Sequence, residues 1–143
     1  MKTIAIACDH AGFIAKRVVL DFLESQGFNV LDFGTDSEES VDYPDFIHPA
    51  VEAIEKGKAD MGVVMCGSGQ GAAITANKHC KIRAALCWTP ELAALARQHN
   101  NANVLAIPAR FVSDETVRKM LEAFFSTDFE GGRHERRVGK ICV

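Results

Sequence analysis

The 143-residue chain is long enough for one domain that buries roughly two-thirds of its unfolded surface in a single core. Its 48% hydrophobic and 24% charged residues and its net charge of −3 argue against a whole-protein attraction to nucleic acid or to anionic membranes. No apolar run approaches the roughly 20 residues that a membrane span requires. The opening stretch, MKTIAIACDH, reads as a strand rather than a secretion signal. We therefore expect one cytoplasmic domain, residues 1–143.

Cysteine usage gives no sign of a metal site or of a set of disulfides. The chain has five cysteines, an odd number, and none lies in a CxxC pair. Zinc sites and disulfide frameworks normally show paired cysteine spacings. We expect most of these cysteines to be buried, reduced thiols that pack as small hydrophobic side chains: Cys8, Cys66, Cys80, Cys87 and Cys142.

The first half of the chain alternates strand-forming runs with helical patterns. Short apolar runs predict strands at residues 3–8 and 28–33, and the apolar spacing between them predicts a helix that ends near Gly27. A second helical pattern ends at Gly57 and leads into a third strand at residues 61–66.

The second half continues the same alternation. A glycine-rich turn follows the third strand and opens a helix that extends to about Lys78. A fourth strand is predicted at residues 83–87, after which Thr89 is a good N-cap because proline follows it. A fifth strand at residues 104–107 precedes a last helix, which Ser113 caps.

This regular strand–helix alternation predicts an α/β fold with a five-stranded parallel sheet and helices on both faces. In such sheets, ligands bind at the carboxyl ends of the strands. We therefore expect Asp9–His10, Cys66–Gly71 and the loops after the fourth and fifth strands to lie along one edge of the sheet.

Residues 66–71 read CGSGQG, and three known phosphate- or nucleotide-binding motifs resemble this turn in part. A dinucleotide-binding motif prefers the first strand–helix turn and an acidic residue at the end of the next strand, where this chain has Cys87–Trp88. A Walker loop needs a Gly-Lys-Ser/Thr sequence, which is absent. The phosphate loop of cysteine phosphatases needs an arginine six positions after the cysteine, where this chain has Ala72. None of the three motifs is complete.

A simpler chemistry fits the turn. Its three glycines let backbone N–H groups turn inward, and the following helix adds positive potential at its N-terminus. Such a turn stabilises an anion, including a transient enediolate. The same field can lower the pKa of a cysteine from its usual value of about 8.5. Cys66 is therefore a candidate base or nucleophile; the alternative is a thiol at a strand end that only packs.

Two further polar pairs follow predicted elements. Asp9 and His10 come after the first strand, and the alternative to a binding role is that Asp9 caps a helix and His10 is exposed. His99 and Asn100 lie between the fourth helix and the fifth strand. Asparagine is common at helix ends, so the second pair alone is weak evidence for a site.

The segment EGGRHERRV near the C-terminus suits a phosphate, because guanidinium groups bind oxyanions through two hydrogen bonds. Its arginines are Arg133, Arg136 and Arg137. The alternative is a solvated basic tail. We expect His48 and His79 to lie on the surface, and the acidic loop at residues 35–45 to be solvated, because its carboxylates lack the ordered spacing of a metal site.

Five motifs together resemble a known family: CDHAGF, DYPD, CGSGQGAAITANK, RQHNNANVLA and EGGRHERRV. In order and spacing they are similar to the family of type B ribose-5-phosphate isomerases and galactose-6-phosphate isomerases. The resemblance implies a Rossmann-like α/β/α sandwich that forms a homodimer, or a dimer of dimers, with shared active sites at the subunit interface. It also implies that residues 126–143 complete a site or a dimer contact.

The resemblance further implies a reaction of the pentose phosphate pathway, the interconversion of D-ribose 5-phosphate and D-ribulose 5-phosphate without a metal or an organic cofactor. Cys66 would be the base, His99 would assist ring opening, and the Ser68 hydroxyl would bond the enediolate. The expected substrate-binding residues are Asp9, His10, Tyr43, Gly67, Ser68, Gly69, Gln70, Gly71, Asn100, Arg110, Arg133 and Arg137.

Two alternatives remain open at this point. One is an isomerase of a six-carbon phosphosugar, such as allose 6-phosphate or galactose 6-phosphate, because Trp88 stands where the family is expected to have a smaller residue. The other is a phosphosugar- or nucleotide-binding module without activity, although the pair of Cys66 and His99 argues against it. The family's variant base, a glutamate a few residues after the cysteine position, is absent here, since residues 72–74 are Ala-Ala-Ile.

Overall fold

A computed structural model describes all 143 residues. In chain order the elements are β1 (Thr3–Cys8), α1 (Phe13–Ser25), β2 (Asn29–Asp32), α2 (Tyr43–Glu55), β3 (Met61–Cys66), α3 (Gln70–Ala76), β4 (Ala84–Leu86), α4 (Pro90–Asn100), β5 (Val104–Pro108), α5 (Asp114–Ser126) and α6 (Arg133–Val138). The five predicted strands and the helices between them are confirmed. The short helix α6 was not predicted, and calling α5 the last helix was wrong.

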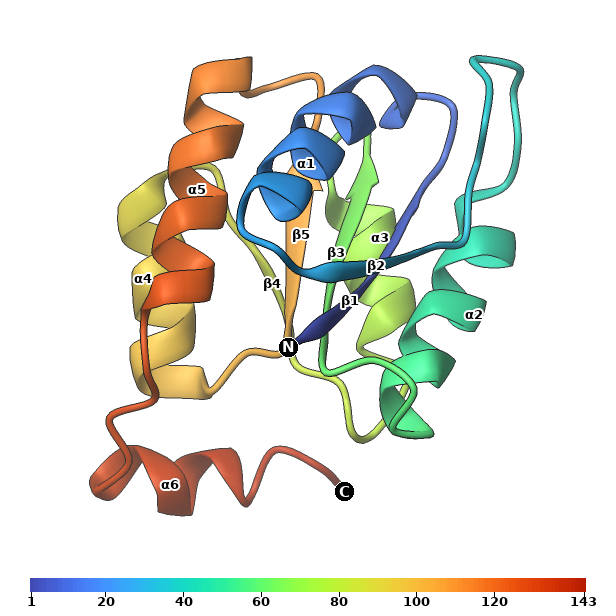
Figure 1. The fold of residues 1–143 in the computed structure, drawn as a ribbon. Helices are drawn as coiled ribbons and strands as arrows, with labels where there is room; N and C mark the ends of the chain where they lie inside the picture. The colour runs from blue at the N-terminus through green and yellow to red at the C-terminus, as the bar shows by residue number, and fades with distance from the viewer.

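The sheet is parallel throughout, in the order β2-β1-β3-β5-β4 (Figure 1). Helices α1, α4 and α5 cover one face and α2 and α3 cover the other, so two hydrophobic cores lie on either side of the sheet. The three central strands β1, β3 and β5 are almost fully buried, which explains why they are continuous apolar runs without alternation. The predicted α/β/α sandwich is therefore confirmed.

The helix starts follow the capping signals in the sequence. The Thr89 hydroxyl oxygen accepts a hydrogen bond from Leu92 N at 3.2 Å, and Ser113 does the same for Thr116 N at 3.1 Å. These bonds satisfy backbone donors that a first helical turn leaves free. None of the helices combines the length and the apolar character needed to cross a membrane.

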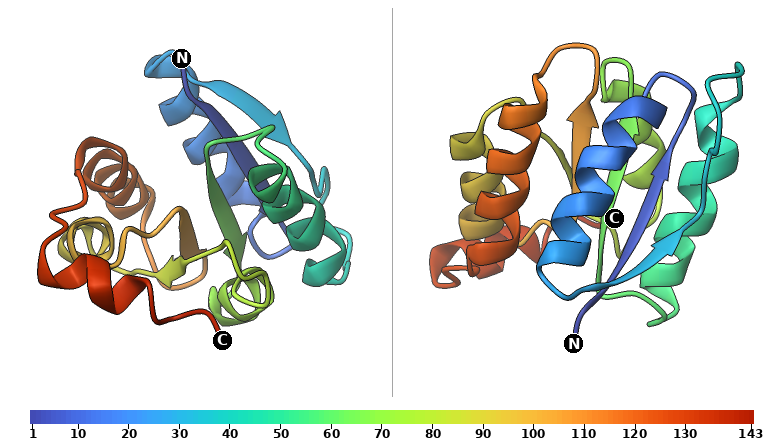
Figure 2. Two further views of the ribbon diagram at one scale, coloured as in Figure 1. Left: turned by 90° about the horizontal axis from the view of Figure 1, so that it is seen from below. Right: turned by 45° about the horizontal axis from the view of Figure 1, so that its top comes forward.

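The expectation that disulfides are absent was wrong for one pair of cysteines. Cys80 and Cys142 form a disulfide, with Cα atoms 5.8 Å apart across 62 residues of sequence. The tail after α6 returns to the end of α3, so the pair is made by tertiary structure that local spacing rules do not detect (Figure 2). Cys8, Cys66 and Cys87 are free and buried, as expected for most of the cysteines.

The prediction that two histidines lie on the surface was also wrong. His48 and His79 are half-buried, with His48 Nδ1 2.7 Å from His79 Nε2, and His79 Nδ1 2.7 Å from Glu55 Oε1. This polar chain joins α2 to the segment after α3 and gives both rings hydrogen-bond partners. In contrast, the acidic loop is exposed over residues 36–40, as predicted.

Candidate active site

The glycine turn begins where the buried strand β3 ends. Cys66 is the last residue of β3 and is 5% exposed. Gly69 has φ of +75°, and a side chain there would place Cβ 2.5 Å from Leu86 Cδ1 and 3.0 Å from Pro108 N. Only glycine meets both requirements, the left-handed backbone and the close approach of β5. The turn is therefore fixed against the sheet directly beside the thiol.

Tyr43 closes the other side of the turn. A Cβ atom on Gly71 would lie 2.5 Å from Tyr43 Cζ and 2.9 Å from its hydroxyl oxygen, so the phenol ring rests on bare backbone. Within the turn, Gln70 N donates to Ser68 Oγ at 3.3 Å. The structure thus brings Tyr43, the turn and Cys66 together, although the two segments are far apart in the sequence.

Asp9 and His10 lie at the carboxyl end of β1, the strand next to β3. Asp9 is buried, and its Oδ1 accepts hydrogen bonds from Ala11 N at 2.9 Å and Gly12 N at 3.2 Å. These bonds fix the turn that precedes α1. The N-cap of that helix is Gly12, so the alternative that Asp9 is the N-cap was wrong. His10 is half-buried, and its Nδ1 accepts from Val41 N at 3.2 Å, which leaves Nε2 as the nitrogen available to a ligand.

Arg110 follows β5 and completes this edge. Arg110 N donates to Gly67 O at 3.0 Å, and a side chain on Gly67 would come within 3.3 Å of the guanidinium. Arg110 also lines a cavity of about 430 Å³ together with His10. We call the residues along this edge the carboxyl-edge group: Asp9, His10, Tyr43, Cys66, Gly67, Ser68, Gly69, Gln70, Gly71 and Arg110. The prediction that the residues after the strands share one edge is confirmed.

A second set of predicted residues lies at the opposite end of the sheet. His99 and Asn100 form the last turn of α4, which runs antiparallel to the strands, and Arg133 and Arg137 lie on α6 below the sheet (Figure 1). We call these four residues the amino-edge group. Arg133 and Arg137 are exposed and are one helical turn apart, so their side chains share a face of α6.

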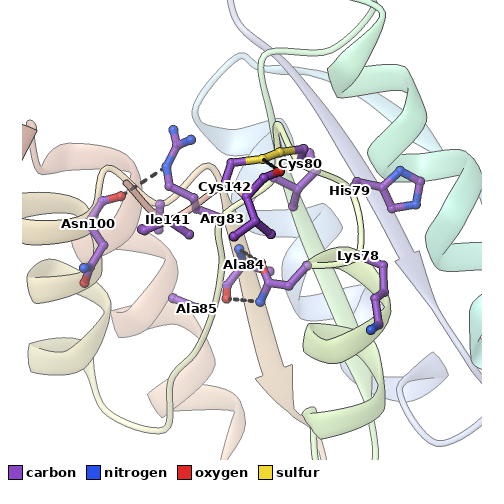
Figure 3. Close-up of a pocket in the computed structure, with 13 residues that line it drawn as sticks. Lys78, His79, Cys80, Arg83, Ala84, Ala85, Asn100, Ile141 and Cys142 are labelled. Atoms are coloured by element: carbon purple, nitrogen blue, oxygen red, sulfur yellow. Dashed lines mark hydrogen bonds between the residues drawn. A yellow bond between two sulfur atoms is a disulfide. The ribbon is translucent and has the colours of Figure 1, made fainter. Parts of the chain in front are cut away.

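Of the amino-edge group, Asn100 alone lines a cavity of about 710 Å³ at this end of the sheet (Figure 3). Arg83 Nε donates to Asn100 O at 3.2 Å on one wall, and the disulfide between Cys80 and Cys142 forms part of another. Cys66 lies at the carboxyl end of β3, so within a single chain it and the amino-edge group lie at opposite ends of the sheet.

Two residues beside His99 were not singled out from the sequence. The His134 ring stacks on the His99 ring with centroids 4.3 Å apart and planes 11° apart. Glu130 Oε2 lies 4.0 Å from His99 Nε2, and Glu130 Oε1 lies 3.9 Å from His134 Nε2. The sequence signal was the i,i+4 spacing of Glu130 and His134 within the motif EGGRHERRV.

These three side chains resemble a metal-ligand set, since their ligand atoms all lie within 4.8 Å of one another. A metal ion lies close to the plane of each imidazole that binds it. The planes of His99 and His134 are nearly parallel and separated, so no single ion lies in both. Arg133 and Arg137 also add positive charge nearby, and their charges help to lower the pKa of His134. The arrangement does not fit a metal centre.

The other free cysteines are poor candidates for a reactive thiol. Burial raises the pKa of Cys8 to about 11 and that of Cys87 to about 11, so both stay protonated at neutral pH. Both side chains also belong to the core under α1, α4 and α5, whereas Cys66 belongs to the core on the other face of the sheet. Cys8 is thus separated from Cys66 by the sheet itself.

Comparison with known proteins identifies the class of protein that this fold and these motifs define. The family model for ribose/galactose isomerases matches residues 4–141, and the chain belongs to this family.

Particular relatives can be named. Ribose-5-phosphate isomerase B of Escherichia coli (strain K12) is 43% identical over 143 residues, covering 100% of this chain and 96% of the relative. The crystal structure of a ribose 5-phosphate isomerase from Thermotoga maritima is 50% identical, with a TM-score of 0.96 and coverage of 99% of this chain and 97% of that chain. Ribose-5-phosphate isomerase B from Mycoplasma genitalium with bound ribulose-5-phosphate is 42% identical, with a TM-score of 0.93 and coverage of 97% and 93%.

Proposed function

We propose that this protein interconverts D-ribose 5-phosphate and D-ribulose 5-phosphate through a cis-enediolate. The observation that carries the proposal is the position of Cys66, a thiol at the end of a buried strand that leads directly into a turn of glycine N–H donors. The relative from Mycoplasma genitalium, solved with bound ribulose-5-phosphate, supports this choice of substrate.

The first chemical step opens the furanose ring of ribose 5-phosphate. Asp9 takes the proton of the anomeric hydroxyl, the bond between C1 and the ring oxygen breaks toward that oxygen, and His99 gives it a proton. The product is the open-chain aldehyde. A positioned acid or base of this kind typically contributes about 100- to 10,000-fold to the rate.

The second step moves a proton between neighbouring carbons. The Cys66 thiolate takes the C2 proton of the aldehyde, and the electron pair delocalises onto the C1 oxygen to form the enediolate. A proton then passes from the C2 hydroxyl to the C1 oxygen, and the thiol returns its proton to C1, which leaves a ketone at C2 and a hydroxyl at C1. Backbone N–H groups of Gly67–Gly71 and the Ser68 hydroxyl stabilise the negative oxygen; each such donor is worth about 3 kcal/mol in comparable sites.

Phosphate binding falls to the arginines of the amino-edge group. The phosphate does not react, so its binding energy serves to hold C1 and C2 in place against the thiol. Because Arg133, Arg137 and His99 lie at the other end of the sheet from Cys66, we propose that a second copy of the chain supplies them. The functional unit is then a homodimer, or a dimer of dimers, with two shared sites per pair, and the enzyme acts in the cytoplasm.

Hybrid dimers test both the reaction and the shared site. We expect Cys66→Ala to be nearly inactive, and Arg137→Ala to keep only about a tenth to a hundredth of the wild-type rate when ribose 5-phosphate is well below KM. In a hybrid of the two, one site combines an intact Cys66 with an intact Arg137. Refolding an equimolar mixture should restore about a quarter of the wild-type activity, because random pairing makes half of the dimers hybrid. A mixture as inactive as its components would mean that each site lies within one chain.

The alternatives are separated by two assays. A panel of five- and six-carbon aldose phosphates under identical conditions should give the highest kcat/KM for ribose 5-phosphate; a preference for allose 6-phosphate or galactose 6-phosphate would overturn the choice of sugar. Incubation in deuterium oxide should place deuterium at C1 of ribulose 5-phosphate. A phosphosugar-binding module without activity would incorporate none.

A further inference from the structure

The His99 ring is held by two side chains that have no assigned role. His134 stacks on it in nearly parallel orientation, and the His134 side chain is 9% exposed against 39% for His99. His134 Nε2 has no hydrogen-bond partner within the chain although it is buried. Most buried polar atoms are paired, and an unpaired one in a native structure calls for a specific explanation.

Glu130 faces the same edge of both rings. One carboxylate oxygen lies 4.0 Å from His99 Nε2 and the other lies 3.9 Å from His134 Nε2. The backbone of Glu130 is fixed to α4, because Glu130 N donates to Gln98 O at 3.0 Å, one residue before His99. The carboxylate and the two rings therefore keep their arrangement through a main-chain contact, independently of any ligand.

We propose that Glu130 and His134 are positioning residues that hold His99 as the acid of the ring-opening step. Stacking on His134 fixes the plane of the His99 ring, and the Glu130 carboxylate stabilises the protonated form from the Nε2 side. Nδ1 of His99 is then the nitrogen that delivers the proton to the ring oxygen. The inference rests on the proposed function, and it extends that function to two residues outside the reacting groups.

The charges around the stack agree with this assignment. The pKa of His134 is lowered, first by burial and then by the positive charges of His99, Arg133 and Arg137, and only Glu130 acts in the opposite direction. His134 is therefore the neutral partner of the stack at neutral pH. His99, the more exposed ring, is the one that can reach a substrate.

The test compares two reactions of the same enzyme, one from each of its two sugar phosphates. Ribulose 5-phosphate carries phosphate on its C5 oxygen, so its C2 ketone cannot close a furanose ring. Exchange of its C1 proton with deuterium oxide needs Cys66 and the enediolate, but no ring step. Net conversion of ribose 5-phosphate, whose stable form is the closed furanose, needs the ring step as well. A residue that serves His99 should affect conversion and spare exchange, whereas damage to the fold or to the dimer would lower both.

We expect Glu130→Gln and His134→Ala to lower net conversion at least tenfold while C1 exchange stays within about twofold of wild type. Glu130→Asp, which keeps the charge, and His134→Phe, which keeps the stack, should recover most of the conversion.

Glu135→Gln is the matched control, since Glu135 is an exposed carboxylate on α6. It should leave conversion and exchange unchanged. Equal losses of conversion and exchange in the Glu130 and His134 variants, or no loss in either, would overturn the positioning role. Absence of both reactions in the wild-type protein would instead refute the proposed function, so the two failures are distinguishable.

Discussion

The carboxyl-edge group and the amino-edge group differ in whether main-chain or side-chain atoms form them. The first is made largely of main chain: a strand end, a glycine turn and a helix start, all fixed by the sheet. The second is made of long, charged or ionisable side chains on a helix end and on α6, whose only buried residue is His134. The first offers backbone N–H groups in a fixed arrangement, and the second offers positively charged and imidazole side chains.

The roles proposed for the two groups follow from this difference. An enediolate needs donors that are already oriented when the charge develops, and backbone amides at a rigid turn meet this need. A phosphate is bound by positively charged groups such as the two arginines, and a leaving ring oxygen needs a proton donor. Side chains provide both. The proposed reaction uses both groups, which lie at opposite ends of the sheet within one chain. The following experiments test this contrast.

The largest effect should come from Cys66, the side chain of the carboxyl-edge group that is proposed to move the proton between C2 and C1. Cys66→Ala should lower both conversion and C1 exchange by about 1,000-fold, within the range expected for a catalytic base. Binding of ribulose 5-phosphate, measured by calorimetry, should change little because the turn and the arginines remain. Cys87→Ala, which removes a buried thiol of the other core, serves as control. Full exchange activity in Cys66→Ala would remove the thiol from the mechanism.

Loss of a phosphate contact in the amino-edge group should have a smaller effect with a different kinetic signature. Arg137→Ala is expected to raise KM for ribose 5-phosphate by about 10- to 100-fold and to lower kcat less, because the phosphate contact holds substrate and transition state alike. Arg136→Ala, on the same helix and also exposed, is the matched control. If both variants raise KM equally, the effect is general attraction of the anion by the basic helix, and no particular contact is involved.

A smaller effect is expected from changing the shape of the glycine turn without removing a chemical group. In Gly71→Ala the new methyl group would overlap the Tyr43 ring, which must move. We expect kcat/KM to fall about tenfold, since small displacements of positioning groups reduce rates strongly. Gly139→Ala, at φ of −61° and with its nearest contact at 3.4 Å, should have no effect. Activity in Gly71→Ala equal to that of wild type would show that the fit of Tyr43 on the turn is irrelevant.

The carboxyl-edge group was predictable from the sequence for a physical reason. Its strand end and its turn have local signatures, which are the apolar run of β3 and the alternating glycines. The caps Thr89 and Ser113 likewise mark helix starts and so the order of strands and helices. Tyr43 and Arg110 were expected only from the family resemblance. Local signatures reflect short-range forces, which one stretch of chain already specifies. The edge strand β4 was predicted longer than it is, because only Ala84–Leu86 pair with β5.

Much of the amino-edge region has no local signature. Helix α6 spans six residues that read RHERRV, with no apolar periodicity, and it is held by contacts with the end of α4. The stack of His134 on His99 and the approach of Glu130 depend on how two segments meet after α5. The disulfide is similar, since the pairing of Cys80 with Cys142 depends on the path of the tail. Tertiary contacts of this kind are invisible to spacing rules.

The disulfide offers the test with the smallest expected effect on activity. Under denaturing conditions without reductant, a thiol reagent should count three free thiols, and five after reduction, in agreement with one bonded pair among five cysteines. Reduction, or Cys142→Ser, should change KM for ribose 5-phosphate by less than about twofold, because Arg133 and Arg137 precede the tail and α6 follows a backbone bond between Glu130 and Gln98. A large rise in KM on reduction would mean that the amino-edge group depends on the tail for its shape. Five free thiols before reduction would show that the pair is not formed in solution.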